Sequence, residues 1–519
     1  MVFKKEGLNV GRSRTKNVVI NLLFMLPCQT IIWVLEFCLR RKFASTLGMI
    51  YMGVESTFSN VLLFFSILNL GVIPAISISL YKPLADGDVE KLRSIVAFTK
   101  KVCLIIAGCF AVIGWVLSFN LQLIANNIYE IPRIRTIYLL FLANILLPCF
   151  FAHLRSVILY NQKKYIIVII DFISISLGLI AKMFFLNYHS GLISFAFCAV
   201  TSTILEGLII FFVAKRLYPF LSVKTKKPLS RQEIHLIFKN VGGGVFNQGF
   251  GLIVHATVNV YMSRFVGLAA MGVYAPYQHI LTVVKNFNWH FCESIGPSVG
   301  DLATLGERKK LEARFYAVLL INNWIFGAVV CILATSVNGV IKLWLPTNRV
   351  FDKMTCYIIL INFYLLAVRK IVLMFKENMG IYWDGKYVTL CEAVLNIILG
   401  YFLAGYGAIG VFGALTISIL CTCFWREPWL LFRLGFKKSP ISFFKKQLLY
   451  YVAAAGSCLI NAYIFLGVTF VGWGQVLVVS VVSVFVHGLL LLIFFGRTQE
   501  FLFLKQLILR RFLLVLSCF

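Results

Sequence analysis

The chain has 519 residues, of which 60% are hydrophobic and 13% are charged, and its mean hydropathy is +0.89. Soluble domains carry about 25% charged residues, and a soluble chain this apolar could not cover its surface with polar groups. The composition therefore excludes an ordinary soluble protein and predicts a chain that lies in a lipid bilayer.

Apolar runs of about 20 residues, the length of helix that crosses a bilayer, recur along the chain. Backbone amides in lipid need partners within the chain, so each run must be a helix. The runs are also twice as long as the strands of a membrane β-barrel and lack their alternation. We predict an all-α integral membrane protein with about fourteen transmembrane helices, at residues 17–38, 55–80, 96–119, 136–158, 165–186, 191–214, 236–262, 271–295, 315–337, 355–376, 387–403, 408–431, 447–467 and 474–495.

Basic residues outnumber acidic ones by 49 to 20, which gives a net charge of +29. In a soluble protein this balance suggests a nucleic-acid partner, but the cytoplasmic loops of membrane proteins are also rich in Lys and Arg. If both termini are cytoplasmic, the predicted cytoplasmic segments hold 38 of the 49 basic residues and the opposite side holds 10. We therefore expect a multi-pass protein with cytoplasmic termini and no nucleic-acid partner.

The two halves of the chain share a short signature at the same place. Arg41-Lys42-Phe43 and then Met52-Gly53-Val54 follow the first predicted span, and Ser263-Arg264-Phe265 and then Met271-Gly272-Val273 follow the seventh. This indicates a parallel duplication, which in transporters places the substrate pathway at the interface of the halves. The predicted domains are a six-helix bundle at 1–214, a cytoplasmic loop at 215–239, a second six-helix bundle at 240–431, and two additional helices with a cytoplasmic tail at 432–519.

Ionisable side chains inside membrane spans are energetically costly and are usually functional. Lys285 and Glu293 are eight residues apart, so they share a helix face and form either a charge pair or a polar stripe along a cavity. Other ionisable residues lie near the ends of their spans, where snorkelling to the interface would explain them. These residues are Asp171, Lys182, Arg369 and Glu392.

The seventh predicted span is rich in glycine and in amide side chains, which cannot face lipid unsatisfied. This composition predicts a cavity wall, lined by Asn247, Gln248, His255 and Asn259, with His290 on the next span. His255 could equally be an interior histidine held by hydrogen bonds.

Enzyme signatures are absent from the sequence. It has no Walker loop, and its longest loop, about 25 residues, is too short to form a soluble domain. The 14 cysteines lie mostly singly in apolar runs and have no metal-ligand spacing. We therefore predict a membrane transporter that is not an enzyme and needs no cofactor or metal.

Several short motifs, in order along the chain, resemble those of polysaccharide repeat-unit flippases. This is the Wzx-type branch of the multidrug/oligosaccharidyl-lipid/polysaccharide (MOP, MATE-like) superfamily, which exports O-antigen, capsule and exopolysaccharide units. The motifs cover roughly residues 40 to 430, and they are Leu47-Gly48-Met49-Ile50-Tyr51-Met52-Gly53, Leu70-Gly71, Leu80-Tyr81-Lys82-Pro83-Leu84-Ala85, Arg264-Phe265-Val266-Gly267-Leu268, Gly272-Val273-Tyr274, Ser298-Val299-Gly300-Asp301-Leu302, Lys342-Leu343-Trp344-Leu345, Gly407-Ala408-Ile409-Gly410-Val411-Phe412 and Trp425-Arg426-Glu427-Pro428.

The resemblance implies a protein of the bacterial plasma membrane that moves an undecaprenyl-diphosphate-linked oligosaccharide by alternating access. Its surroundings would be membrane lipid, and a polysaccharide polymerase is a possible partner. A cationic cavity would hold the diphosphate, because basic side chains suit phosphate. The residues that we nominate for it are Lys82, Arg155, Arg264, Lys285 and Arg369.

The sequence departs from the family's pattern at two acidic positions. Relatives commonly carry Glu before Leu70-Gly71 and Asp in the seventh helix, whereas this chain has Asn69 and Val258. Ion coupling, if it occurs, would then move to Glu36, Glu206 or Glu293.

Three alternative functions stay open. A drug/cation antiporter of the same superfamily would need an acidic cavity. A membrane polysaccharide polymerase or ligase would usually carry a large outer loop, which this chain lacks. A lipid II or teichoic-acid flippase would carry a related substrate.

Overall fold

The computed structural model describes residues 10–66, 76, 83, 88–126, 128–160, 164–188, 191–219, 229–346, 349–381 and 383–506. Within these ranges it leaves out the side chains of 10–24, 26, 66, 160, 164, 235–248, 297, 301, 304 and 383. The described part of the chain is nearly all helical and contains no strand. The chain divides into two compact units, Met1–Gly272 and Val273–Phe519.

Within the described residues, unit 1 contains eight helices and the start of a ninth. They are α2 (Val10–Thr46), α3 (Gly48–Leu62), α6 (Val89–Leu117), α7 (Ile134–Leu146), α8 (Pro148–Tyr160), α9 (Lys164–Asn187), α10 (Gly191–Leu217) and α11 (Arg231–Tyr261). A 3-10 turn, Leu63–Ser66, extends α3, and a π turn, Met262–Val266, extends α11. Two further 3-10 turns, Leu121–Leu123 and Ile128–Glu130, join α6 to α7.

Unit 2 is built from helices of similar length. They are α12 (Leu268–Thr304, which begins in unit 1), α13 (Arg308–Trp344), α14 (Lys353–Asn378), α15 (Lys386–Leu403), α16 (Ala408–Cys421), α17 (Cys423–Leu430), α18 (Ile441–Ile464) and α19 (Trp473–Phe495). Short turns at Trp383–Gly385, Ala404–Tyr406 and Leu431–Phe436 extend α15 and α17.

Ten described segments are long and apolar enough to cross a membrane. They are Val89–Leu117, Ile134–Leu159, Tyr165–Asn187, Gly191–Leu217, Arg308–Trp344, Lys353–Asn378, Lys386–Tyr406, Ala408–Phe436, Ile441–Ile464 and Trp473–Phe495. Three of the other four predicted spans fall on α2, α11 and α12, of which α11 and α12 are interrupted by polar side chains. The span predicted at 55–80 begins on α3, and most of it beyond Ser66 lies outside the described residues. The predicted all-α multi-pass fold is confirmed, and the sidedness of the termini stays a prediction.

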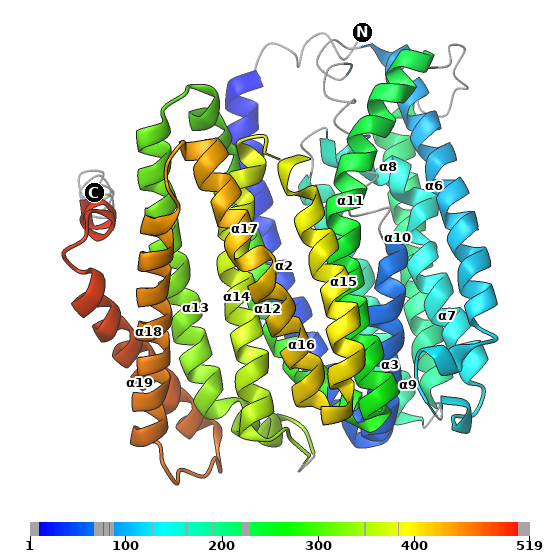
Figure 1. The fold of residues 1–519 in the computed structure, drawn as a ribbon. Helices are drawn as coiled ribbons and strands as arrows, with labels where there is room; N and C mark the ends of the chain where they lie inside the picture. The colour runs from blue at the N-terminus through cyan, green and yellow to red at the C-terminus, as the bar shows by residue number, and fades with distance from the viewer. Residues whose placement is uncertain are drawn as a thin grey trace, which may run out of the picture. The chain divides into compact units, whose positions relative to one another are not determined.

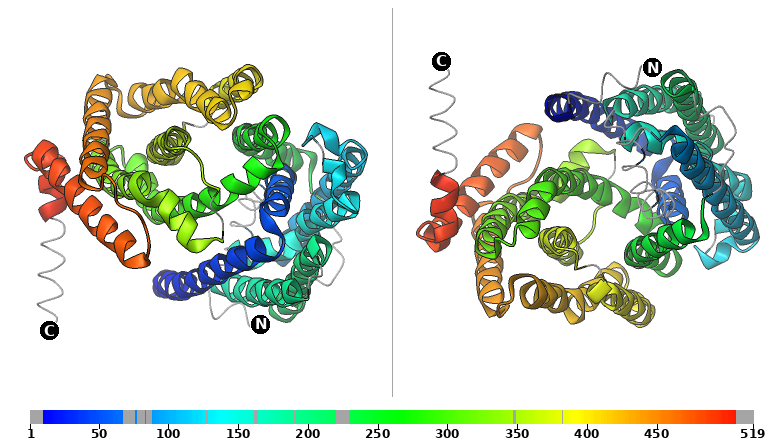
Figure 2. Two further views of the ribbon diagram at one scale, coloured as in Figure 1. Left: turned by 90° about the horizontal axis from the view of Figure 1, so that it is seen from below. Right: turned by 90° about the horizontal axis from the view of Figure 1, so that it is seen from above.

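In unit 1, the helices pack around an apolar core between α6, α8, α9 and α10. Its buried members include Ile95, Cys149, Ile158, Ile170 and Ile210. Figure 2 views this unit along its helices and shows α6 to α10 (cyan to green) grouped side by side. Pro148 lacks the amide hydrogen that would continue α7, so the helix is renewed as α8 there.

In unit 2, the long helix α13 contacts α14, α18 and α19, as Figure 1 shows in yellow-green and orange-red. Phe315 on α13 lies at the centre of an aromatic cluster, with ring centroids 5.1 Å from Phe375 and 5.7 Å from Phe432. The two predicted additional helices therefore pack as part of this unit. The predicted domain limits themselves stay a prediction, and the two units meet within α12 and not in the 215–239 loop.

The repeated Met-Gly-Val signature marks a close helix crossing. Gly53 of α3 and Gly272 of α12 lie against each other, within unit 1. A methyl group on Gly53 would overlap the Leu268 carbonyl oxygen, and one on Gly272 would overlap the Met49 carbonyl oxygen. The contact is reciprocal, because each glycine meets the carbonyl four residues before its counterpart. Only glycine allows two helix backbones to approach this closely.

Candidate functional site

Three neighbouring helices of unit 1 bring one arginine and two acids together. Arg155 of α8 donates from Nη1 to Glu206 Oε1 of α10 at 2.5 Å and from Nη2 to Asp171 Oδ2 of α9 at 2.6 Å. We call these three residues the first triad. Their side chains are 34%, 21% and 26% exposed, in the order Arg155, Glu206, Asp171.

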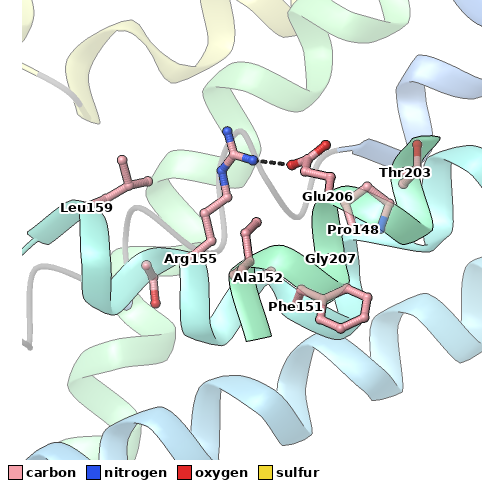
Figure 3. A pocket seen from close by; sticks show the side chains of 10 residues that line it. Pro148, Phe151, Ala152, Arg155, Leu159, Thr203, Glu206 and Gly207 are labelled. Atoms are coloured by element: carbon pink, nitrogen blue, oxygen red, sulfur yellow. Dashed lines mark hydrogen bonds and ion pairs between the residues drawn. The ribbon is translucent and has the colours of Figure 1, made fainter. Parts of the chain in front are cut away.

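Two members of the first triad, Arg155 and Glu206, line a cavity of about 400 Å³ between α8 and α10. Figure 3 shows Arg155 and Glu206 pointing toward one another across it, with Phe151 and Thr203 also on its wall. Gly207 follows Glu206 and lets the Phe151 ring lie directly against α10, because any side chain there would overlap the ring. The cavity has room for several water molecules, which occupy about 30 Å³ each.

Unit 2 contains a second set of one arginine and two acids, which we call the second triad. Arg369 of α14 donates from Nη1 to both oxygens of Glu392 on α15 at 2.9 Å. It also donates from Nε and Nη2 to the two oxygens of Glu427 on α17, at 3.2 and 3.1 Å. Both carboxylates are 2% exposed and the arginine 15%. The adjoining cavity, about 20 Å³, is little larger than one water-sized probe.

The two triads occupy equivalent places in the predicted repeat. In each half the arginine lies on the fourth predicted span, one acid on the fifth and the other acid on the sixth. Asp171 is the eighth residue of α9 and Glu392 the seventh of α15. This correspondence agrees with the predicted duplication, which itself stays a prediction.

The triads change the interpretation of several predicted residues. Snorkelling is wrong for Arg369 and Glu392, which are buried and paired, because a charge that cannot reach water needs a partner. Arg155 and Arg369, nominated for substrate phosphate, each face two carboxylates, so neither adds net positive charge to its surroundings. Their role in binding substrate stays a prediction. Glu427 was not predicted as a site residue, because the motif that contains it, Trp425-Arg426-Glu427-Pro428, served only as part of the family resemblance.

Lys285 is a predicted basic residue with no acidic neighbour among the described residues. It is the 18th of the 37 residues of α12, its side chain is exposed, and it has no hydrogen-bond or ion-pair partner within the described residues. Glu293 is about 12 Å further along the helix axis, and its Oε2 lies 3.4 Å from His290 Nδ1. The polar-stripe alternative for α12 is therefore favoured over a Lys285–Glu293 charge pair.

Two further predicted residues, Arg264 and Glu36, lie elsewhere in unit 1. Arg264 donates to the Leu123 carbonyl at 3.1 Å. Glu36 belongs to a mixed-charge group with Arg40, Glu55 and Lys182, in which Arg40 Nη1 lies 2.5 Å from Glu55 Oε2. Neither finding tests the assigned roles.

On α11, the His255 side chain is exposed and its carbonyl accepts a hydrogen bond from Asn259 Nδ2 at 2.8 Å. Asn259 Oδ1 is buried without a partner in the described structure. Lys82 and the side chains of Asn247 and Gln248 lie outside the described residues.

Unit 2 also contains an apolar groove of about 600 Å³ between α13, α14, α16 and α18. Helix α18 forms one wall, with Tyr451, Ala455, Cys458 and Leu459 among the lining residues. Almost every lining side chain is apolar, so the groove suits a hydrocarbon chain and not a sugar.

These features define a multi-pass helical membrane protein with two units and an arginine–acid triad in each. No family model and no curated protein matches the chain. Solved structures of transporters do match it.

A lipid II flippase, MurJ, in an inward closed conformation, covers 92% of this chain and 99% of its own at a TM-score of 0.66 and 15% identity. The match to an inward-facing multidrug resistance MATE family transporter of the MOP superfamily covers 77% of this chain and 93% of that one, at a TM-score of 0.61 and 14% identity. A third match is a MOP superfamily transporter from Pyrococcus furiosus, described as having a binding pocket of reversed polarity. This match covers 82% of this chain and 98% of that one, at a TM-score of 0.51 and 13% identity. The chain therefore has the fold of the MOP superfamily transporters.

Proposed function

We propose that the protein is a flippase that moves undecaprenyl-diphosphate-linked oligosaccharide repeat units across the bacterial plasma membrane by alternating access. It would supply surface polysaccharide synthesis, and its termini would be cytoplasmic. The similarity to a lipid II flippase over 92% of the chain supports a lipid-linked substrate. The motifs shared with polysaccharide repeat-unit flippases support the particular substrate class.

The observation that carries the proposal is the unpartnered Lys285, halfway along α12. A lone ammonium group at membrane depth is costly unless an anion or water meets it. A diphosphate supplies two negative groups and strong acceptor oxygens. A drug/cation antiporter would instead need an acid at such a position, so Lys285 favours the flippase.

The apolar groove beside α18 supports the lipid part of the substrate. A polyprenyl chain that stays in the membrane while its head group crosses needs apolar walls along its path. The groove offers such walls between α13 and α18. Because α18 forms one wall, the two additional helices would serve the lipid tail.

The direct test deletes the gene from a strain with no redundant transporter. Lipid-linked repeat units should then accumulate on the cytoplasmic leaflet, and surface polysaccharide should be lost. Repeat units that still reach the outer face would contradict the proposal.

Rescue of that strain with variants tests Lys285 itself. Lys285→Glu should lower export about tenfold or more, because it replaces attraction for phosphate by repulsion, while Lys285→Arg should retain most of it. Lys342→Glu, at an exposed position near the end of α13, is the matched control and should export normally. Equal export by Lys285→Glu and Lys342→Glu, at equal membrane levels, would remove Lys285 from the site.

A lipid II flippase is the second candidate, because the MurJ structure covers nearly the whole chain. Expression in cells depleted of their own lipid II flippase separates the two candidates. Restored growth would favour lipid II, and failure to restore growth, together with lost surface polysaccharide in the deletion strain, would favour repeat units.

A further inference from the structure

Two cysteines of unit 2 that are far apart in the sequence have their sulfur atoms in contact. Cys331 on α13 and Cys458 on α18 are separated by 127 positions, and the Cys458 thiol donates to Cys331 Sγ at 3.5 Å. The Cys331 thiol donates in turn to the Ala454 carbonyl oxygen of α18 at 3.7 Å. A disulfide bond is about 2.05 Å long. The two sulfur atoms therefore need to approach by only about 1.5 Å to become bonded.

The two thiols differ in what can reach them. Cys331 is 0% exposed, whereas Cys458 is partly exposed and lines the apolar groove of about 600 Å³. A reagent that enters the groove therefore meets Cys458 first, with Cys331 in contact with it. An accessible thiol beside a second, resolving thiol is the arrangement found in redox-sensitive cysteine pairs. Because almost every lining side chain is apolar, the groove favours a lipid-soluble reagent over an ionic one.

A buried histidine next to the pair can accept a proton. His487 of α19 is 0% exposed, and its Nε2 lies 3.3 Å from the Asn323 carbonyl oxygen. A carbonyl oxygen can only accept, so Nε2 carries the hydrogen and Nδ1 is the basic nitrogen. Nδ1 lies 3.0 Å from Ser457 Oγ, and the Ser457 hydroxyl also hydrogen-bonds with the Cys331 thiol. This path to a base matters because the thiolate is the nucleophile in cysteine chemistry.

A second pair of cysteines provides a contrast within the same chain. Cys103 of α6 and Cys149 of α8 are neighbours in unit 1, and they are 0% and 1% exposed. No hydrogen bond joins their sulfur atoms within the described residues, and neither lines the groove or the two cavities described above. Burial alone therefore does not distinguish the pair on α13 and α18, whereas sulfur contact and access from the groove do.

We propose that Cys331 and Cys458 form a redox-active dithiol, which an apolar hydroperoxide, of the kind carried by an oxidised acyl chain, converts to a disulfide from the groove. The product would be a covalent tie between α13 and α18 along one wall of the groove. The proposal goes beyond the proposed transport function and does not depend on it.

The reaction has two steps. The Cys458 sulfur attacks the terminal peroxide oxygen, the O–O bond breaks, and the alcohol leaves with the thiol proton, so that Cys458 becomes a sulfenic acid. The Cys331 sulfur then attacks the Cys458 sulfur, the S–O bond breaks, and the hydroxide leaves with the Cys331 proton as water. In total, two thiols lose two electrons, and the hydroperoxide gains two.

The test uses the purified full-length natural protein, reduced and then placed in lipid vesicles without reductant. Cumene hydroperoxide is the apolar probe, free thiols are then alkylated, and peptide mass spectrometry looks for a Cys331–Cys458 linkage that reduction removes. Hydrogen peroxide at the same concentration should form this linkage about tenfold more slowly or less, because it does not partition into an apolar groove. Cys103 and Cys149 are the internal control and should stay reduced.

Single variants establish the order of attack. In Cys331→Ala, Cys458 should accumulate as a sulfenic acid that dimedone traps, whereas in Cys458→Ala the Cys331 thiol should stay unmodified. Ser457→Ala interrupts the path to His487 and should slow the linkage about tenfold or more. Ser480→Ala on α19 is the matched control, because that hydroxyl donates to the Val476 carbonyl of its own helix. A merely structural role for Ser457 would lower the unfolding temperature without slowing the linkage.

Three outcomes would overturn the proposal. The first is that cumene hydroperoxide forms no Cys331–Cys458 linkage in the natural protein. The second is that hydrogen peroxide forms it equally fast, and the third is that dimedone labels Cys331 in Cys458→Ala. Export by the deletion strain is a separate measurement, so the proposed function and the dithiol stand or fall independently.

Discussion

The two triads contain the same three chemical groups on equivalent helices, but their surroundings differ. In unit 2 the carboxylates are 2% exposed and every carboxylate oxygen is bonded to Arg369. In unit 1 the carboxylates are 21% and 26% exposed, a cavity adjoins them, and Asp171 Oδ1 is unpaired within the described residues. The comparison teaches that the same three groups can be buried and fully hydrogen-bonded in one unit and remain accessible in the other.

Removal of the arginine should show the largest difference between the copies. Arg369→Ala leaves two buried carboxylates uncompensated and should cost about 3–5 kcal/mol of stability. Arg155→Ala should cost less, about 1.5–3 kcal/mol, because water in the cavity can solvate the acids that remain. Thermal unfolding of the two purified variants measures this difference. Equal losses would show that the first triad is as closed as the second.

A smaller change should make the first triad resemble the second. Gly207→Ala overlaps the Phe151 ring and forces it toward the cavity, with an expected loss of about 1–3 kcal/mol. Gly413→Ala on α16 is the matched control, because open space surrounds that position and alanine favours a helix by about 1 kcal/mol. Unfolding temperatures check both variants. A Gly207→Ala protein as stable as the control would contradict the described packing.

The smallest expected effect on the free energy of unfolding comes from an exposed ion pair. Lys91 Nζ lies 2.7 Å from Glu233 Oε1, just before the predicted span of α11. The hydrogen bond from Lys91 and that from the Ser230 backbone hold the pKa of Glu233 below its ordinary value of 4.5. The folded-state pKa is lowered, so this contribution to stability is present above pH 4.5 and is lost as pH falls below it.

The expected size of this contribution is about 0.2–1 kcal/mol, since both side chains are exposed. Glu233→Gln should flatten this part of the acid-side stability curve and leave stability at pH 7 nearly unchanged. Unfolding temperatures between pH 3 and pH 7 provide the check. A loss as large as that of Arg155→Ala would mean that the pair is not solvent-screened.

The helical multi-pass fold could be predicted from the sequence because apolar length and lipid solvation leave few alternatives. The triads were harder to predict. Arg369 and Glu392 lie 23 positions apart in sequence and near span ends, where snorkelling was an equally good explanation. What could have revealed them is the pattern of one arginine and two acids on the fourth, fifth and sixth spans of each half. Which acids remain accessible depends on side-chain packing such as that of Phe151 on Gly207, and no sequence pattern reports it.

The reciprocal contact of Gly53 and Gly272 limits how the two halves of the chain can diverge. A backbone carbonyl cannot swing aside as a side chain can, so a larger residue at either position must displace a whole helix. The two triads tolerate a difference in surroundings, since one is open and the other closed. At this crossing a substitution on either helix would push the other helix away, so the two glycines constrain each other.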